Sequence, residues 1–91
     1  MNTHTFYSDP GLAWLEVPME ELETLGIARK ISRYSYHKDG LAYLEEDQDA
    51  YVYIQARKLA GKCELEFKFT ESNSLSPIRG YDRFTEKEIS L

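Results

Sequence analysis

Four carboxylates lie close together near the middle of the chain, and closely spaced carboxylates are the groups that bind hard divalent cations. They are Glu45, Glu46, Asp47 and Asp49. The spacing of a calcium-binding loop is not met: counted from Asp47, the sixth position is Val52 rather than glycine and the twelfth is Lys58 rather than glutamate. We therefore interpret the cluster as the acidic start of a helix, with no metal ion, and as a surface that contacts lysines and arginines of a partner.

Side chains that could act as nucleophile or base occur at Ser32, Ser35, His37 and Cys63. Their spacing places no two of them within hydrogen-bonding reach, and such catalysis also needs a third, orienting group. His4 and His37 with Cys63 make an incomplete set of zinc ligands. The sequence therefore predicts no catalytic residue, no cofactor and no metal, and we expect a protein that is not an enzyme.

Basic and aromatic residues are interleaved in one segment, 29–38, as in sheets that stack RNA bases. They are Arg29, Lys30, Arg33, Tyr34, Tyr36, His37 and Lys38. The net charge of the chain is −5, which argues against a general nucleic-acid binder because such binding depends on neutralised phosphates. A nucleic-acid-binding accessory module that uses this segment is therefore our alternative hypothesis.

Tyrosine is the most frequent aromatic residue, with seven tyrosines against four phenylalanines and one tryptophan. Tyrosine offers a large contact area at low entropic cost and is enriched where proteins bind proteins. Tyr51 follows the acidic cluster, whereas Arg79 and Tyr81 lie near the C-terminus. We expect these three residues to anchor a contact with a partner, together with the four clustered carboxylates.

The elements that must position these residues follow from the hydrophobic periods, which change in the order β-α-β-β-α-β. We expect single strands at 12–17 and 63–70. Two more strands are expected in a hairpin at 32–46 that turns at Asp39 and Gly40. Helices are expected from Pro18 to Gly26 and over about 12 residues before Gly61. The predicted fold is a ferredoxin-like α+β two-layer sandwich with a four-stranded antiparallel sheet.

Two finer features of this fold can also be predicted. Alternation along 63–70 predicts that the last strand is antiparallel to its neighbour and has one solvated face. The buried stripe of the second helix is expected to consist of Val52, Ala56, Leu59 and Ala60.

The 91 residues fit one domain. We expect an N-terminal arm at 1–11, a single α+β domain at 12–71 and an irregular C-terminal tail at 72–91. The tail keeps apolar residues among its polar ones, so it could fold back on the sheet. An open sheet also leaves an edge strand through which two copies could form a homodimer.

The single cysteine excludes a disulfide within the chain, which fits a reducing compartment. The N-terminus has no signal-peptide pattern, and no apolar run is long enough to span a bilayer. We expect a cytoplasmic protein with no membrane contact.

Four stretches of the chain, GLAWLEVP, LGIARKISRYSY, GLAYLEEDQDA and SPIRGYDRF, resemble those of a family of small uncharacterised bacterial proteins carried on phages, plasmids and genomic islands. The resemblance covers most of residues 11–84. As a class, small acidic proteins of mobile elements resemble anti-CRISPR and anti-restriction inhibitors of host defence. The resemblance therefore implies a non-enzymatic protein that binds a host protein or nucleoprotein complex and blocks its attack on nucleic acid.

Overall fold

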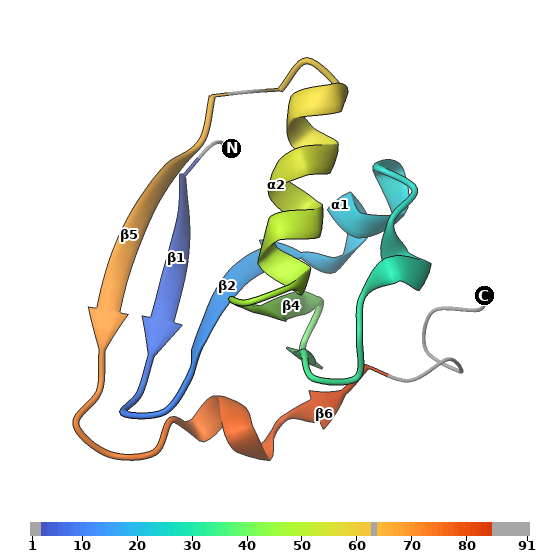
Figure 1. Cartoon of the computed structure of the whole chain (residues 1–91). Coiled ribbons are helices and arrows are strands. Elements are labelled where there is room, and N and C mark those ends of the chain that lie inside the picture. The colour runs from blue at the N-terminus through green and yellow to red at the C-terminus, as the bar shows by residue number, and fades with distance from the viewer. Residues whose placement is uncertain (1–2, 63, 85–91) are drawn as a thin grey trace.

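A computed structural model describes residues 3–62 and 64–84 of the chain (Figure 1). Over these residues the elements are β1 (Thr3–Ser8), β2 (Ala13–Pro18), α1 (Met19–Thr24), the 3-10 helix η1 (Ala28–Lys30), β3 (Tyr36–Lys38), β4 (Leu41–Glu45), α2 (Asp49–Leu59), β5 (Glu66–Glu71), the 3-10 helix η2 (Pro77–Gly80) and β6 (Asp82–Arg83). The protein is thus a small α+β protein with a mixed sheet and two α-helices. No helix in the described part of the chain is long and apolar enough to cross a membrane.

The sheet has six strands in the order β5-β1-β2-β4-β3-β6, so the predicted four-stranded ferredoxin-like sheet is wrong. The two additional strands come from the segments expected to be the N-terminal arm and the C-terminal tail. β1 inserts between β2 and β5, and β6 extends the other edge beside β3. β5 is the edge strand next to β1.

The predicted antiparallel position of the last strand is also wrong, because β5 runs parallel to β1. The chain passes from β4 through α2 to β5, which is the crossover that connects parallel strands. β1 and β4 both run antiparallel to β2, which lies between them. β1 therefore runs in the same direction as β4. The crossover gives β5 that direction too, so β1 and β5 pair in parallel.

The α+β character and most of the predicted elements are confirmed. β2, α1, the β3–β4 hairpin, α2 and β5 overlap the predicted elements, and the hairpin turns at Asp39 and Gly40, whose φ angles are 52° and 81°. α2 ends in a motif in which Lys62 N–H donates to the Arg57 carbonyl and Gly61 N–H donates to the Lys58 carbonyl. Gly61 has a φ of 77°, the left-handed conformation that this motif requires.

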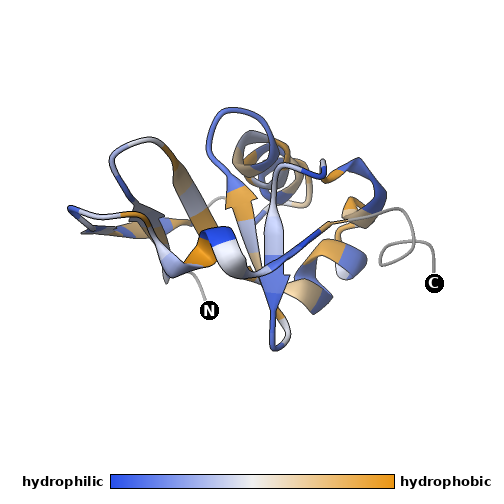
Figure 2. Ribbon diagram, turned by 90° about the horizontal axis from the view of Figure 1, so that it is seen from below, coloured by the Kyte–Doolittle hydropathy of each residue, from blue (hydrophilic) through white to orange (hydrophobic). Residues whose placement is uncertain are grey.

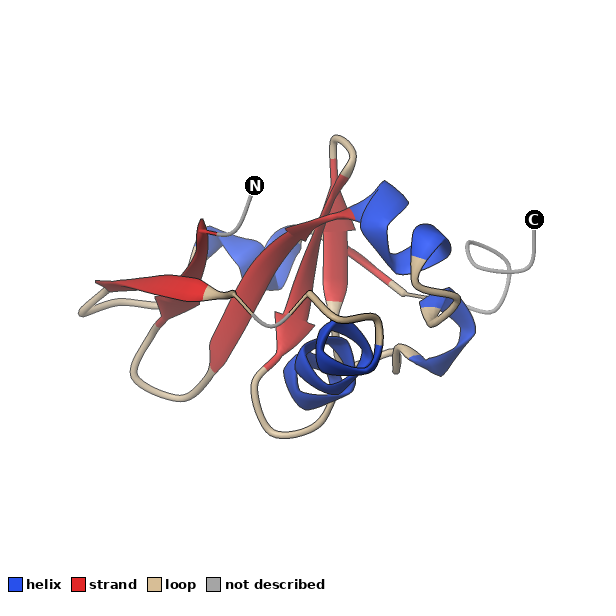
Figure 3. Ribbon diagram, turned by 90° about the horizontal axis from the view of Figure 1, so that it is seen from above, coloured by secondary structure: helices blue, strands red, loops and turns tan. Residues whose placement is uncertain are grey.

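The main core lies between the sheet and the helices. Leu15 and Val17 of β2 and Ala42 and Leu44 of β4 point to this side and are buried under α2 and α1. α2 lies along one face of the strands, as Figure 3 shows from above. Phe84, which follows β6, is buried in the same core, so the C-terminal segment takes part in the fold.

The buried stripe of α2 differs from the prediction. The buried residues are Asp49, Ala50, Tyr53 and Arg57, whereas Leu59 is 89% exposed. Of the predicted residues, Val52 and Ala56 are half-buried and pack against the main core, whereas Ala60 is exposed like Leu59. Three of the four fully buried side chains carry polar groups, so a search for apolar residues finds only part of the buried face. Their spacing of three to four residues is nevertheless that of one helix face.

A second, smaller core covers the opposite face of the sheet. It is formed by Trp14, Tyr36, Tyr43 and Ile78, with Tyr7, Leu41 and Tyr81 packed against it. Ile78 comes from η2, so η2 covers one end of this face (Figure 2, seen from below). Both faces of the sheet are therefore partly covered, one by α-helices and the other by the C-terminal segment.

Candidate functional site

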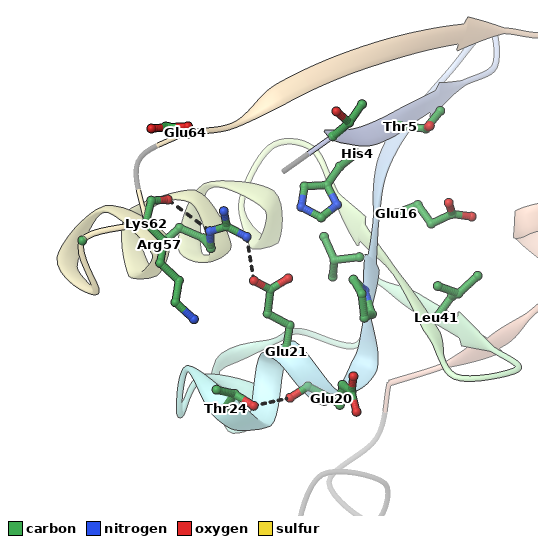
Figure 4. A pocket seen from close by; sticks show the side chains of 14 residues that line it. His4, Thr5, Glu16, Glu20, Glu21, Thr24, Leu41, Arg57, Lys62 and Glu64 are labelled. Atoms are coloured by element: carbon green, nitrogen blue, oxygen red, sulfur yellow. Dashed lines mark hydrogen bonds and ion pairs between the residues drawn. The ribbon is translucent and has the colours of Figure 1, made fainter. Parts of the chain in front are cut away.

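A cleft of about 770 Å³ opens between β1, α1 and the C-terminal end of α2 (Figure 4). It exists because β1 and β2 pair only over Phe6–Ser8 and Ala13–Leu15, so that Thr3–Thr5 and Glu16–Pro18 are not paired with each other. Both unpaired stretches line the cleft. The side chains of His4, Glu21 and Arg57 reach it from three different elements.

A hydrogen-bond network lies at the inner side of this cleft. Tyr53 Oη donates to Glu21 Oε1 at 2.7 Å and lies 2.9 Å from His4 Nε2. Arg57 NH1 donates to Glu21 Oε2 at 2.7 Å and to Tyr53 Oη at 3.2 Å. Tyr53 is fully buried, and His4 and Arg57 are nearly so. The network joins β1, α1 and α2.

The single proton of Tyr53 fixes the roles in this network. Because that proton goes to Glu21, the phenol oxygen accepts from Arg57 and the bond to His4 must be donated by Nε2–H. Burial lowers the pKa of His4 below its ordinary value of 6.5. Burial and the hydrogen bond to Glu21 raise the pKa of Tyr53. A neutral His4 and a neutral Tyr53 are thus the stable forms at neutral pH.

A stability change with pH follows from His4. Its pKa is lower in the folded state, so the unfolded chain binds a proton first and the free energy of unfolding falls as the pH drops below about 6.5. The slope for one proton is at most about 1.4 kcal/mol per pH unit, reached where His4 is protonated in the unfolded chain and neutral in the folded one. Urea unfolding between pH 7 and 5.5 should show this loss, and His4→Gln should flatten it. An equal slope in His4→Gln would contradict the role of His4.

This network was not predicted, because His4 lies in the segment expected to be an arm. A signal was present in Tyr53 and Arg57, which are four residues apart on one helix face. The four polar groups bond mainly to one another, with Arg57 also donating to the Lys62 carbonyl, and among the described lining residues the hydroxyls of the cleft belong to threonines. The arrangement is suited to locking α2 against α1 and β1.

The tyrosine-rich face on the other side of the sheet is the second candidate. We define the tyrosine face as Tyr7, Trp14, Tyr36, Tyr43, Ile78 and Tyr81. Strand register aligns a row across four strands: Glu16 pairs with Tyr43, Tyr43 with Tyr36, and Tyr36 with Arg83. Partner residues across antiparallel strands project from the same face, so this register explains why the tyrosines gather.

A pocket of about 280 Å³ opens in this face, which we call the tyrosine pocket. Its walls include Tyr7, Tyr43, Tyr81 and Glu16. The ring centroids of Tyr43 and Tyr81 are 5.2 Å apart, and those of Tyr7 and Tyr43 are 6.3 Å apart. Burial, and next a hydrogen bond with Glu16, raise the pKa of Tyr43. The pocket thus combines three phenol rings with a carboxylate.

An ion pair anchors the C-terminal segment beside this pocket. Arg79 donates from Nε to Asp9 Oδ2 at 2.6 Å and from NH2 to Oδ1 at 2.9 Å, and Ser76 N–H also donates to Oδ2. The hydrogen bonds from Arg79 hold the pKa of Asp9 well below its ordinary value. Arg79, expected to anchor a partner, therefore has an internal role as well, while its side chain is 32% exposed.

The structure separates the residues expected to form one contact surface. Tyr51 is 62% exposed on α2, on one side of the sheet, whereas Tyr81 packs in the tyrosine face on the other. Glu46 and Asp47 are exposed, and the Glu45 carboxylate accepts from the N–H groups of Asp47 and Gln48. No group of three or more metal-binding side chains occurs within residues 3–62 and 64–84.

Asp49 requires a correction, because it is fully buried and is not a surface carboxylate. Its Oδ2 accepts from Ser32 N–H at 3.0 Å, from the Ser32 hydroxyl at 2.7 Å and from the Ser35 hydroxyl. Ser35 is itself fully buried, and its Oγ accepts from Glu45 N–H. Asp49 and Ser35 therefore tie the loop before β3 to the start of α2 and to β4, and neither is placed to contact a partner.

The structure also separates the two tyrosines of the basic segment 29–38. Tyr34 precedes β3 and is 65% exposed, whereas Tyr36 is 5% exposed, so the two rings do not share an open face. The strand begins only at Tyr36, which explains the difference. His37 contacts the ring of Phe84, and Cys63 lies outside the described residues.

Comparison with protein-family models, with curated proteins and with solved structures gave no match. The class of protein is therefore defined by the structure alone: a small α+β protein with a six-stranded mixed sheet, a polar cleft on the helical side and a tyrosine pocket on the other.

Proposed function

We propose that the protein is a non-enzymatic protein-binding domain and that the tyrosine face is its contact surface. The tyrosine pocket is the observation that carries this proposal. Tyr7 and Tyr81 are half-buried and line it, so part of each residue is accessible to solvent although neither lies in the main core. Tyrosines that offer a ring and a hydroxyl at the edge of a pocket are typical anchors of protein interfaces.

The exposed acidic residues extend this proposal. Glu46 and Asp47, with Tyr51 on α2, are accessible and fit a partner that carries lysines and arginines. Because they lie on the helical side, they form a second contact area rather than part of the tyrosine face. β5 has its outer edge unpaired within the described residues, and a homodimer through this edge is proposed as well.

The proposed target is a host complex that attacks foreign nucleic acid, which the protein would block by occupying its surface. This part of the proposal is supported by the resemblance to proteins of mobile elements and by the net charge of −5, which suits a basic surface. We further propose that the protein acts in the bacterial cytoplasm.

Affinity capture with matched variants tests the proposal. The tagged full chain should retain a bacterial protein from a nuclease-treated lysate, and Tyr81→Ala should weaken that binding roughly thirtyfold, about 2 kcal/mol for an anchor residue. Tyr34→Ala, an exposed tyrosine outside the tyrosine face, is the control and should bind like the parent. Mass spectrometry of the retained protein then tests whether it belongs to a nucleic-acid-targeting complex.

The outcomes separate the hypotheses. Equal binding by Tyr81→Ala and the parent would contradict the proposed surface, and a retained protein unrelated to nucleic acid would contradict the inhibitor role. The alternative, a nucleic-acid-binding accessory module, is favoured by the exposure of Arg29, Lys30, Arg33 and Tyr34. It predicts retention that nuclease abolishes and that Tyr34→Ala weakens.

A further inference from the structure

The tyrosine pocket has the composition of a site for a positive charge. Three of its walls are phenol rings, and an aromatic face attracts a cation within about 6 Å of its centroid. The adjacent rings, 5.2 and 6.3 Å apart, meet at interplanar angles of 56° and 60°, so they are tilted rather than stacked face to face. Tilted rings do not cover each other's faces as stacked rings do.

The charges that line the pocket have one sign. Glu16 and Glu71 are the only ionised side chains in the described part of its lining, which holds no lysine, arginine or histidine. Glu16 pairs with Tyr43 across the strands, so its carboxylate lies beside the tyrosine rings in the pocket lining. A ligand with a positive charge would therefore meet a carboxylate beside the rings.

The same face already binds the cations of its own chain. The Arg79 guanidinium lies 5.6 Å from the Trp14 ring, and the Arg83 guanidinium lies 4.9 Å from the Tyr36 ring. The Lys38 ammonium lies 4.8 Å from the ring of Tyr81, although Lys38 does not line the pocket. Tyr7 and Tyr43 also line the pocket, and neither takes part in such a pair among the described residues.

We propose that the tyrosine pocket receives a single cationic side chain, a lysine or an arginine, of the partner protein. The inference rests on the proposed function and specifies what the tyrosine face recognises. The volume of about 280 Å³ is below the range of about 300–1,000 Å³ typical of pockets for drug-sized ligands, which fits one side chain rather than a folded segment. When the cationic side chain of the partner binds, Lys38 would either leave the ring of Tyr81 or share that ring with it.

Blocked amino acids test this proposal on the intact chain. Nα-acetyl-lysine methylamide and Nα-acetyl-arginine methylamide should shift the NMR signals of the Ile78 methyl groups and the Tyr43 ring in a saturable manner, with dissociation constants on the order of 1 mM. The norleucine derivative is the neutral control and should bind at least about tenfold more weakly. A derivative with trimethylated lysine tests whether ring contacts alone suffice, because its ammonium donates no hydrogen bond.

Two charge-matched variants complete the test. Glu16→Gln should weaken binding of the cationic probes about fivefold, whereas Glu23→Gln on α1 makes the same change in net charge and should leave it unaltered. Equal binding of norleucine, no effect of Glu16→Gln, or no saturable shift would overturn the proposal. If any of these occurs while Tyr81→Ala still weakens capture of a protein, the tyrosine face keeps its proposed function and only the cationic occupant is wrong.

Discussion

Replacing Asp49 with alanine is expected to lower the free energy of unfolding by about 3 kcal/mol, measured by urea denaturation. One carboxylate oxygen accepts three hydrogen bonds, two from Ser32 and one from Ser35. Hydrogen bonds to a charged group contribute about 1.5–3 kcal/mol each, and the total is less than their sum because the other oxygen, Oδ1, is buried without a partner. A chain of this length is stabilised by about 5–13 kcal/mol, so the loss is a large share.

Two further variants separate the causes of this loss. Asp49→Asn keeps an acceptor oxygen but removes the charge and places an amide where Oδ1 has no partner, so we expect an intermediate loss of about 1–2 kcal/mol. Asp47→Ala, two residues earlier in the same acidic cluster but exposed, should change stability by less than about 0.5 kcal/mol. Equal effects of Asp47→Ala and Asp49→Ala would contradict the structural role of Asp49.

Asp49 also shows how far the sequence could be interpreted. In the sequence, Asp49 follows three acidic residues. Nothing in their spacing distinguishes a carboxylate on the solvated side of the helix from one on the buried side. The helix face is set by tertiary contacts with Ser32 and Ser35, which lie 14 to 17 residues earlier. The existence of the helix and the inward position of Val52 and Ala56 were predictable, but the burial of Asp49 was not.

The missed strands have a similar cause. In the sequence THTFYS of β1, polar residues outnumber apolar ones, and the strand is stabilised by ladders to β5 and β2, of which β5 lies about 60 residues away. β6 is only two residues long and depends on β3. Local periodicity identified the strands that carry their own hydrophobic alternation, such as β2 and β4. Strands defined by their neighbours could not be found in this way.

The tyrosine pocket illustrates the same limit for the candidate site. The tyrosine content and Tyr81 were recognisable in the sequence, but Glu16 and Tyr7 join Tyr43 only through strand register and through the position of β1. The pairing of Glu16 with Tyr43 would have followed from a correct alignment of β2 with β4. The contribution of Tyr7 required β1, which was not predicted.

Replacing Arg57 with alanine is expected to lower the free energy of unfolding by about 3 kcal/mol, again measured by urea denaturation. The Arg57 side chain is 4% exposed and that of Glu21 is 17% exposed. Removing the guanidinium leaves the Glu21 carboxylate largely desolvated without its ion pair, and it removes the donor to the Lys62 carbonyl that follows α2. Arg29→Ala, at an exposed arginine, is the control and should cost less than about 0.5 kcal/mol.

The size of the loss depends on the unpaired carboxylate, and a double variant can show this. In Glu21→Met/Arg57→Met both charges are replaced by apolar chains of similar length, so no desolvated charge is left and much of the cost should disappear. Tyr53 would then lose an acceptor and a donor, which limits the recovery. We expect the double variant to be more stable than Arg57→Ala by about 1 kcal/mol or more. If it is less stable than Arg57→Ala, the charged network itself, rather than the avoidance of an unpaired charge, holds α2 against α1.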